Sequence, residues 1–158
     1  MAKVDAEVLL DKLKTFIKEN IGTIISDINS EKNDSIVMSA PHANAYVELS
    51  MDNAILNYDP FIFIYVEPLP SIINGPRVQK DIKFEVVLFK AKESGITSDS
   101  IMGLRYMRAM EELGIAAWDK VFKGFHYNIE TMTPIDVQLV NSTKWHSVYG
   151  ISLTVSLS

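Results

Sequence analysis

The residue types that most often bind metals or act as nucleophiles are few in this chain and lie far apart. The three histidines, His42, His126 and His146, form no metal-ligand motif, and a single histidine near a strand end is mostly a surface or hydrogen-bonded residue. The chain has no cysteine, so disulfides, zinc fingers, iron–sulfur clusters and thiol catalysis are excluded. We therefore expect neither a metal site nor a metal cofactor.

The acidic residues and the glycines form no catalytic pattern either. Glu111 and Glu112 are adjacent, so on a helix their side chains point about 100° apart and cannot share a proton. Asp52, Asp59 and Glu67 are close enough in sequence to meet, but acid–base catalysis also needs a pocket that shifts a pKa. The seven glycines match no nucleotide-binding motif, and no Gly-x-Ser-x-Gly motif occurs. We expect a protein that is not an enzyme and binds no cofactor.

The composition is that of a folded domain with an acidic surface. The 158 residues fit a single domain, 1–158, in which 47% of the residues are hydrophobic and 22% are charged. A net charge of −5 argues against a general nucleic-acid binder, whose affinity comes from clustered lysine and arginine. The first residues lack a signal-peptide core and no apolar run reaches eighteen residues, so we expect synthesis in a cytoplasm and no membrane contact.

A first helix is predicted to begin near Asp5 and to end near Gly22. The segment 23–29 has helical spacing but many β-branched residues, and we favour a short helix over a strand. Residues 30–45 are polar and contain a proline, which indicates a loop. The helix should bury one apolar stripe, formed by Ala6, Leu9, Leu10, Leu13, Phe16 and Ile17.

A second helix is predicted from the capping residues Thr97 and Ser98 to Leu113, with Gly114 as its end. Its buried stripe should consist of Met102, Tyr106, Ala109, Met110 and Leu113. A further short helix is expected over 116–123, with three inward residues, Trp118, Val121 and Phe122.

Five segments have the pattern of β-strands: 45–51, 61–67, 81–90, 133–141 and 145–157. The last two should form an antiparallel hairpin. The final strand alternates an apolar face, made of Tyr149, Ile151, Leu153, Val155 and Leu157, with a polar one that includes His146, Gly150, Ser152 and Thr154. The predicted class is α+β, with a mixed or antiparallel sheet of about five strands and two main helices on one face.

The connection from Pro68 to Pro76 carries more apolar residues than a surface loop needs. Leu69, Ile72 and Ile73 lie in it, whereas a loop usually tucks one such residue back against the core. Arg77 and Lys80 follow and would form a polar rim. We predict an interface with another subunit or a partner at five residues: Leu69, Ile72, Ile73, Arg77 and Lys80.

The layout as a whole resembles a known family. An N-terminal helix is followed by an apolar strand after an Asp-Pro pair (59–67), by a strand that leads into a helix (84–90 and 105–114), and by an alternating strand (149–155). This order resembles the tail terminator, or tail completion, proteins of long-tailed bacteriophages. The similarity covers nearly the whole chain, is one of pattern, and brings no catalytic motif with it.

The resemblance implies a structural protein of the virion. Members of that family form a ring, usually a hexamer, that caps the head-proximal end of the tail tube, stops its polymerisation and joins tail to head. The implied partners are other copies of the chain, the tail tube protein and a head-completion or connector protein, with no sequence-specific nucleic acid. The implied location is the neck of the virion, assembled in the host cytoplasm. An acidic channel would let DNA pass without sticking.

Other functions fit the same sequence. One is a different head–tail joining protein or a neck component of a contractile injection machine, which only the partner would distinguish. Another is a small α+β ligand-binding or enzyme domain, which would be a monomer or dimer with a closed apolar pocket and converging polar groups. A cellular adaptor is a further alternative.

Overall fold

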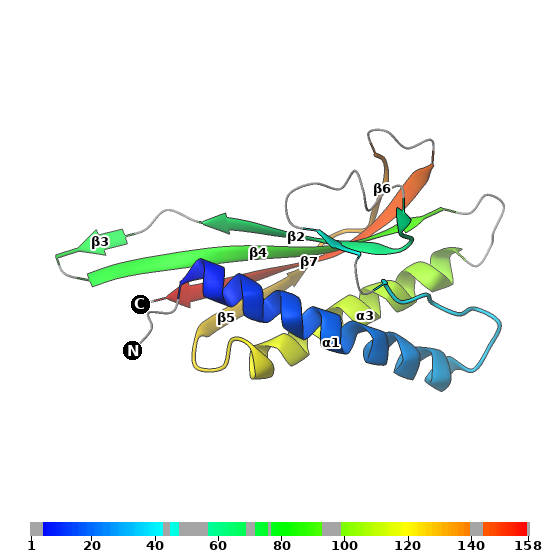
Figure 1. The fold of residues 1–158 in the computed structure, drawn as a ribbon, viewed down its shortest axis with the longest axis horizontal. Coiled ribbons are helices and arrows are strands. Elements are labelled where there is room, and N and C mark those ends of the chain that lie inside the picture. The colour runs from blue at the N-terminus through cyan, green and yellow to red at the C-terminus, as the bar shows by residue number, and fades with distance from the viewer. Residues whose placement is uncertain are drawn as a thin grey trace.

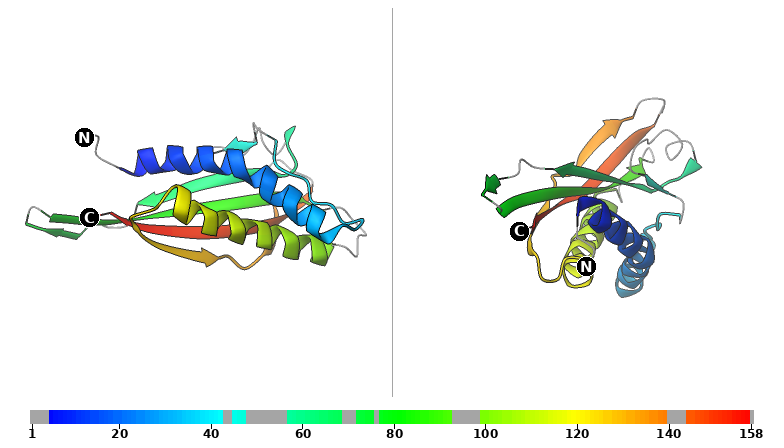
Figure 2. Two further views of the ribbon diagram at one scale, coloured as in Figure 1. Left: turned by 90° about the horizontal axis from the view of Figure 1, so that it is seen from below. Right: turned by 60° about the vertical axis from the view of Figure 1, so that its left-hand side comes forward.

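A computed structural model of the chain describes residues 5–42, 45–47, 57–68, 72–75, 77–92, 99–139 and 144–157. In this part of the chain two helices, α1 and α3, pack on one face of a mostly antiparallel sheet (Figure 1). Seen from the helix side, the two helices lie next to each other and run roughly along the strands (Figure 2). The predicted α+β class, with two main helices on one face of the sheet, is confirmed.

Helix α1 (Ala6–Lys32) is longer than the sequence pattern suggested. It begins as expected at Asp5, whose side chain accepts a hydrogen bond from the backbone N–H of Val8 at 3.0 Å. Gly22 does not end it, and the ambiguous segment 23–29 is helical. The burial of Ile25 and Ile28 explains this, because it outweighs the roughly 1 kcal/mol that a helical glycine costs.

Helix α3 (Asp99–Lys120) also continues past its predicted end. Gly114 lies inside the helix, where it allows close packing on the sheet: an added Cβ would come within 2.1 Å of the Cδ1 atom of Ile129. No separate helix follows over 116–123. Phe122 is fully buried as predicted, whereas Trp118 is half exposed and the prediction that it points inward was wrong.

The sheet follows the order β1-β2-β4-β7-β5, with β3 paired to β4 and β6 paired to β7. Only the β1–β2 pair is parallel among the described strands. The bounds are Tyr46–Val47 (β1), Phe61–Pro68 (β2), Ile72–Asn74 (β3), Arg77–Ala91 (β4), His126–Thr131 (β5), Ile135–Gln138 (β6) and Trp145–Leu157 (β7). Of the strand predicted over 45–51, residues 48–51 lie outside the described residues.

Strand β7 is the centre of this arrangement. One of its edges pairs with β4 over twelve positions, from Lys80↔Leu157 to Ala91↔His146. Its other edge pairs with β5 at one end and with β6 at the other. The predicted β6–β7 hairpin is confirmed, but β5 was not predicted.

Each face of the sheet has its own apolar cluster. The larger one lies under the helices and includes Phe84, Ile151 and Leu153. The smaller one, on the opposite face, consists of Ala45, Phe61, Val87, Phe89 and Val148. His146 is only 3% exposed and its ring contacts Phe61 edge-on, so the polar face predicted for this end of β7 is in fact covered.

Candidate functional site

The feature of the fold that best fits an interaction site is the β3–β4 arm, defined here as residues 72–75 and 77–79. Strand β4 pairs with β7 from Lys80 onward and with β2 from Ile82 onward. Residues 77–79 therefore have β3 as their partner and no other described strand. Figure 1 shows this two-stranded ribbon projecting beyond the rest of the sheet, at the left.

The arm replaces the connecting loop that the sequence suggested over Pro68–Pro76. Asn74 and Arg77 form its last pair, and Gly75 follows Asn74 with a φ of +60°. A positive φ suits a residue in the short turn of a hairpin, and glycine adopts it without strain. The sequence is compatible with this hairpin, because a Gly-Pro pair marks a turn as well as a longer loop.

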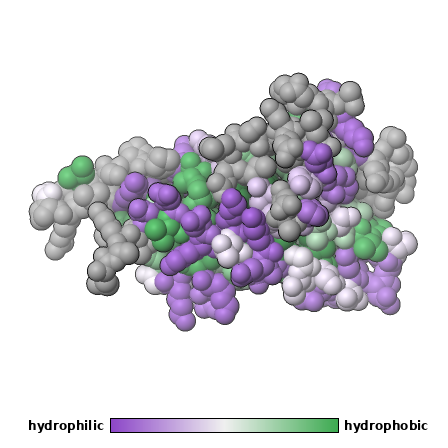
Figure 3. Space-filling model, in the orientation of Figure 1, coloured by the Kyte–Doolittle hydropathy of each residue, from purple (hydrophilic) through white to green (hydrophobic). Residues whose placement is uncertain are grey.

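Four of the five predicted interface residues lie in this arm or at its root. Ile73 lies in β3 with 72% of its surface exposed, and Lys80 lies half-buried at the root of the arm. Ile72 and Arg77 belong to the two strands of the arm, where their backbone alone is described. Leu69 lies outside the described residues. Figure 3 shows hydrophobic surface at the far end of the arm.

The root of the arm is held by polar contacts on the sheet. Ser156 of β7 donates a hydrogen bond to Asp81 of β4 at 2.6 Å. Two residues further along β4, Lys83 forms an ion pair with Glu85 at 3.2 Å. The Ser156–Asp81 hydrogen bond joins the root of the arm to β7, at the centre of the sheet, so that the arm extends from a fixed base.

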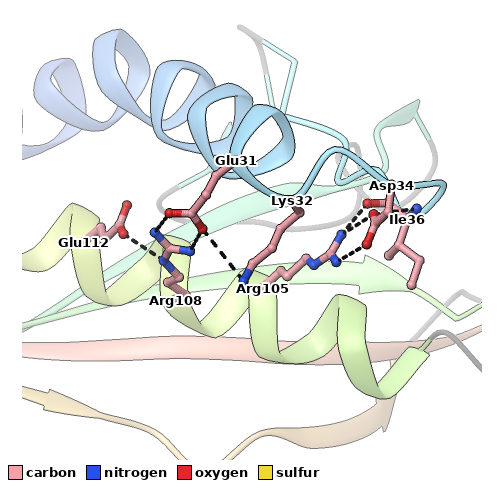
Figure 4. A network of polar contacts seen from close by, with 7 residues as sticks. All are labelled: Glu31, Lys32, Asp34, Ile36, Arg105, Arg108 and Glu112. Carbon is pink, nitrogen blue, oxygen red and sulfur yellow. Dashed lines mark hydrogen bonds and ion pairs between the residues drawn. The ribbon is translucent and has the colours of Figure 1, made fainter.

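A second polar cluster joins the end of α1 to α3 (Figure 4). Arg105, only 7% exposed, donates from both terminal nitrogens to Asp34, at 2.8 and 2.5 Å, and also to the carbonyl oxygen of Ile36 at 2.6 Å. Arg108 donates from both terminal nitrogens to Glu31 and from Nε to Glu112 at 3.0 Å. These two-pronged pairs fix the relative position of the helices.

The segment after α1, residues 33–42, was expected to be part of a polar loop, and it is strapped to both helices. The side chain of Asn29 accepts from the N–H of Met38 and donates to its carbonyl, both at 2.9 Å. The hydroxyl of Tyr106 does the same for Ser39, at 3.0 and 2.9 Å. The sequence gives no local signal for the contact of Tyr106 with Ser39, because the two residues lie 67 positions apart.

The ion pairs shift the pKa values of their carboxyls in the expected direction. The hydrogen bonds from Arg105 lower the pKa of Asp34 to about 2. Hydrogen bonding from Arg108 lowers the pKa of Glu31. Burial, by contrast, lowers the pKa of His146, because it disfavours the charged imidazolium. The two carboxyl shifts belong to contacts that join α3 to the end of α1 and to the segment after it.

The acidic residues considered for catalysis do not converge in the described part of the chain. Asp59 accepts hydrogen bonds from the Lys90 ammonium at 2.8 Å and from the backbone N–H of Ala91 at 2.9 Å, so its role is structural. Asp52 lies outside the described residues. Among the residues with described positions, no three His, Cys, Asp or Glu side chains are grouped so as to hold a metal ion. Within the same ranges, neither helix has the length and apolar character needed to cross a bilayer.

Comparisons with known proteins do not assign the chain to a family. No family model matches it, and no curated protein matches it in sequence. One solved structure, whose title describes no function, has 13% sequence identity and a TM-score of 0.38 over 92% of this chain and 96% of its own. A likeness of that degree carries no argument about function.

Proposed function

We propose that this chain is a structural subunit that assembles with copies of itself into a ring, and that the ring caps the head-proximal end of a phage tail tube. The proposal combines the family resemblance of the sequence with one structural observation, the β3–β4 arm. The ring would end tube polymerisation and join the tail to the head through a connector protein.

The arm supports the proposal of assembly because, among the described strands, it has little packing within the single chain. A two-stranded ribbon is marginally stable in water, and the described strands give residues 77–79 no partner besides β3. Ile73 adds a large exposed apolar side chain to this ribbon. Packing of the arm against a neighbouring subunit would cover Ile73 and support the ribbon at once.

The geometry of such a contact would be heterologous. The arm of one subunit would bind a different surface on the next, and a repeated rotation of this kind closes into a ring. A terminator also needs two unlike faces: one that fits the end of the tube and one that gives no surface for further tube growth.

The test is native mass spectrometry of the purified chain, with negative-stain images of the same sample. We expect a closed ring, six subunits by the resemblance, with a central hole. Ile73→Asp should abolish the ring while the circular dichroism spectrum stays unchanged. The matched control is Ile135→Asp, which charges an exposed isoleucine on β6, at the opposite end of β7 from the arm.

Two results would overturn the proposal. A ring that persists in the Ile73→Asp variant would remove the arm from the subunit contact. A chain that stays monomeric, and also fails to bind purified tail tubes in negative-stain images, would exclude the terminator function and favour the ligand-binding alternative.

A further inference from the structure

The outward surface of α3 is unlike that of α1. On α1 the exposed positions are polar along the helix, with Asp11, Lys18 and Asp27 as examples, and only Val8 interrupts them. On α3 four large apolar side chains are exposed: Ile101 at 45%, Leu104 at 72%, Ile115 at 65% and Trp118 at 50%. The exposed surface of α1 is thus almost entirely polar, whereas that of α3 carries four large apolar side chains.

The four apolar side chains belong to one continuous stripe along the helix, which we call the α3 seam. Its six positions follow one another at intervals of three and four residues, and they are Ile101, Leu104, Arg108, Glu111, Ile115 and Trp118. Alternating steps of three and four are the spacing of the a and d positions of a coiled coil. On the solvent side of a single helix such a seam stays exposed to water, whereas a second helix packed along it would bury it.

The α3 seam is also complementary to itself in reverse. Ile101 and Trp118, Leu104 and Ile115, and Arg108 and Glu111 are three pairs that share one midpoint, between positions 109 and 110. A second α3 laid antiparallel across this midpoint would place apolar residues opposite apolar residues at both ends. At the centre, each Arg108 would face the Glu111 of the other copy.

The central charges select both the partner and its direction. In a parallel pair, Arg108 would face Arg108 and Glu111 would face Glu111, which repel. Glu111 forms no hydrogen bond or ion pair with any residue whose position is described, so its carboxylate is available. Arg108 keeps two of its five N–H donors after binding Glu31 and Glu112, so it can serve a further carboxylate.

We infer that α3 binds the α3 of a second copy of this chain, antiparallel, about a two-fold axis between positions 109 and 110. The contact is isologous, since the same seam serves both copies. It uses α3 and not the β3–β4 arm, so it is independent of the proposed ring. A seam on one 22-residue helix is smaller than the roughly 20–30 residues per side of a standard interface, so the dimer should dissociate on dilution.

The register can be tested by cross-linking, because the chain has no cysteine of its own. Chains carrying Leu104→Cys and chains carrying Ile115→Cys, distinguished by mass, are mixed at about 0.1 mM and treated with a bis-maleimide that spans about 8–10 Å, the usual distance between packed helices. We expect mixed dimers to form at least several-fold more than dimers of either variant alone. In the inferred dimer the two Leu104 positions are about 16 Å apart along the helix axis, too far for that linker.

A charge exchange tests the central pair by a separate route. Glu111→Arg alone and Arg108→Glu alone should each weaken dimerisation tenfold or more in light scattering, since each places like charges opposite each other. A mixture of the two variants should recover the dimer, because both central pairs are then opposite in charge. Circular dichroism of each variant confirms that the fold is retained.

The inference is overturned if Leu104→Cys links to itself as well as to Ile115→Cys, if no linked dimer forms, or if the charge mixture dimerises no better than its components. The Ile73→Asp variant distinguishes the α3 dimer from the proposed ring. It should leave the Leu104–Ile115 cross-link unchanged whether or not the chain forms a ring.

Discussion

The Cδ1 atom of Ile129 on β5 lies where a Cβ on Gly114 of α3 would need space, 2.1 Å from the ideal position of that atom. Gly114→Ala should therefore destabilise the protein by about 1–3 kcal/mol, the cost of overpacking, although alanine regains about 1 kcal/mol of helix propensity. Ile129→Val removes the Cδ1 atom. In chemical denaturation, the double variant should be more stable than the two single changes predict in sum. Strict additivity would show that the helix moves away from the sheet instead.

Tyr106 should be more important for stability than its phenyl ring alone explains. Its hydroxyl both accepts from the N–H of Ser39 and donates to the Ser39 carbonyl. Tyr106→Phe should lower the free energy of unfolding by about 1–3 kcal/mol, because two hydrogen bonds of a buried hydroxyl are lost. Tyr65→Phe is the matched control, since Tyr65 is 46% exposed and should be replaceable without loss. Equal effects of the two changes would show that the hydrogen bonds between Tyr106 and Ser39 do not stabilise the fold.

Asp34 should make the protein sensitive to acid. Hydrogen bonds from Arg105 lower its pKa to about 2 in the folded chain, from the ordinary 3.8. The unfolded chain thus binds the proton more readily, so the stabilisation is complete above the ordinary pKa and is lost as the pH falls toward 2. Denaturation midpoints measured across this range should fall more steeply for the wild type than for Asp34→Asn. If the midpoints of the two proteins fall equally steeply with pH, Asp34 is not the cause of the acid sensitivity.

His146 should add a second pH dependence at milder acidity. Its pKa is lowered by burial, so the unfolded chain binds the proton more readily and stability should decline as the pH falls below about 6.5. Its Nδ1 atom is buried without a hydrogen-bond partner among the described residues. His146→Leu should abolish the decline and stay within about 1 kcal/mol of the wild type at neutral pH. A variant that retains the decline would show that another group titrates.

The parts of the fold with strong periodic patterns were predictable from the sequence. Strand β7 was found with its apolar face because Tyr149 to Leu157 alternate without a break, and most of β4 was found for the same reason. Strand β2 was found because residues 61–67 form a short run that is apolar on both faces. Errors arose where one residue was taken as a stop. Gly22 and Gly114 both lie inside helices, since packing of the neighbouring residues outweighs the local preference of glycine.

The candidate sites show a different limit. The apolar content of residues 69–73 drew attention to the arm region before its strands were known, but β5 was missed because His126–Thr131 is mostly exposed and has a weak alternation. The α3 seam was hidden for another reason. Trp118 was assigned to the inward face of a separate short helix with Val121 and Phe122, and only burial distinguishes an outward apolar stripe from an inward one.

The place of β7 in the sheet has a consequence for synthesis. It follows every other described strand in the chain but lies between β4 and the β5–β6 edge. On the ribosome, β4 and β5 are therefore made without the strand that joins them, and each exposes an unpaired edge until β7 emerges. The β4–β7 pairings join residues 55 to 77 positions apart, so folding is slow and the nascent chain stays open to association with other nascent copies.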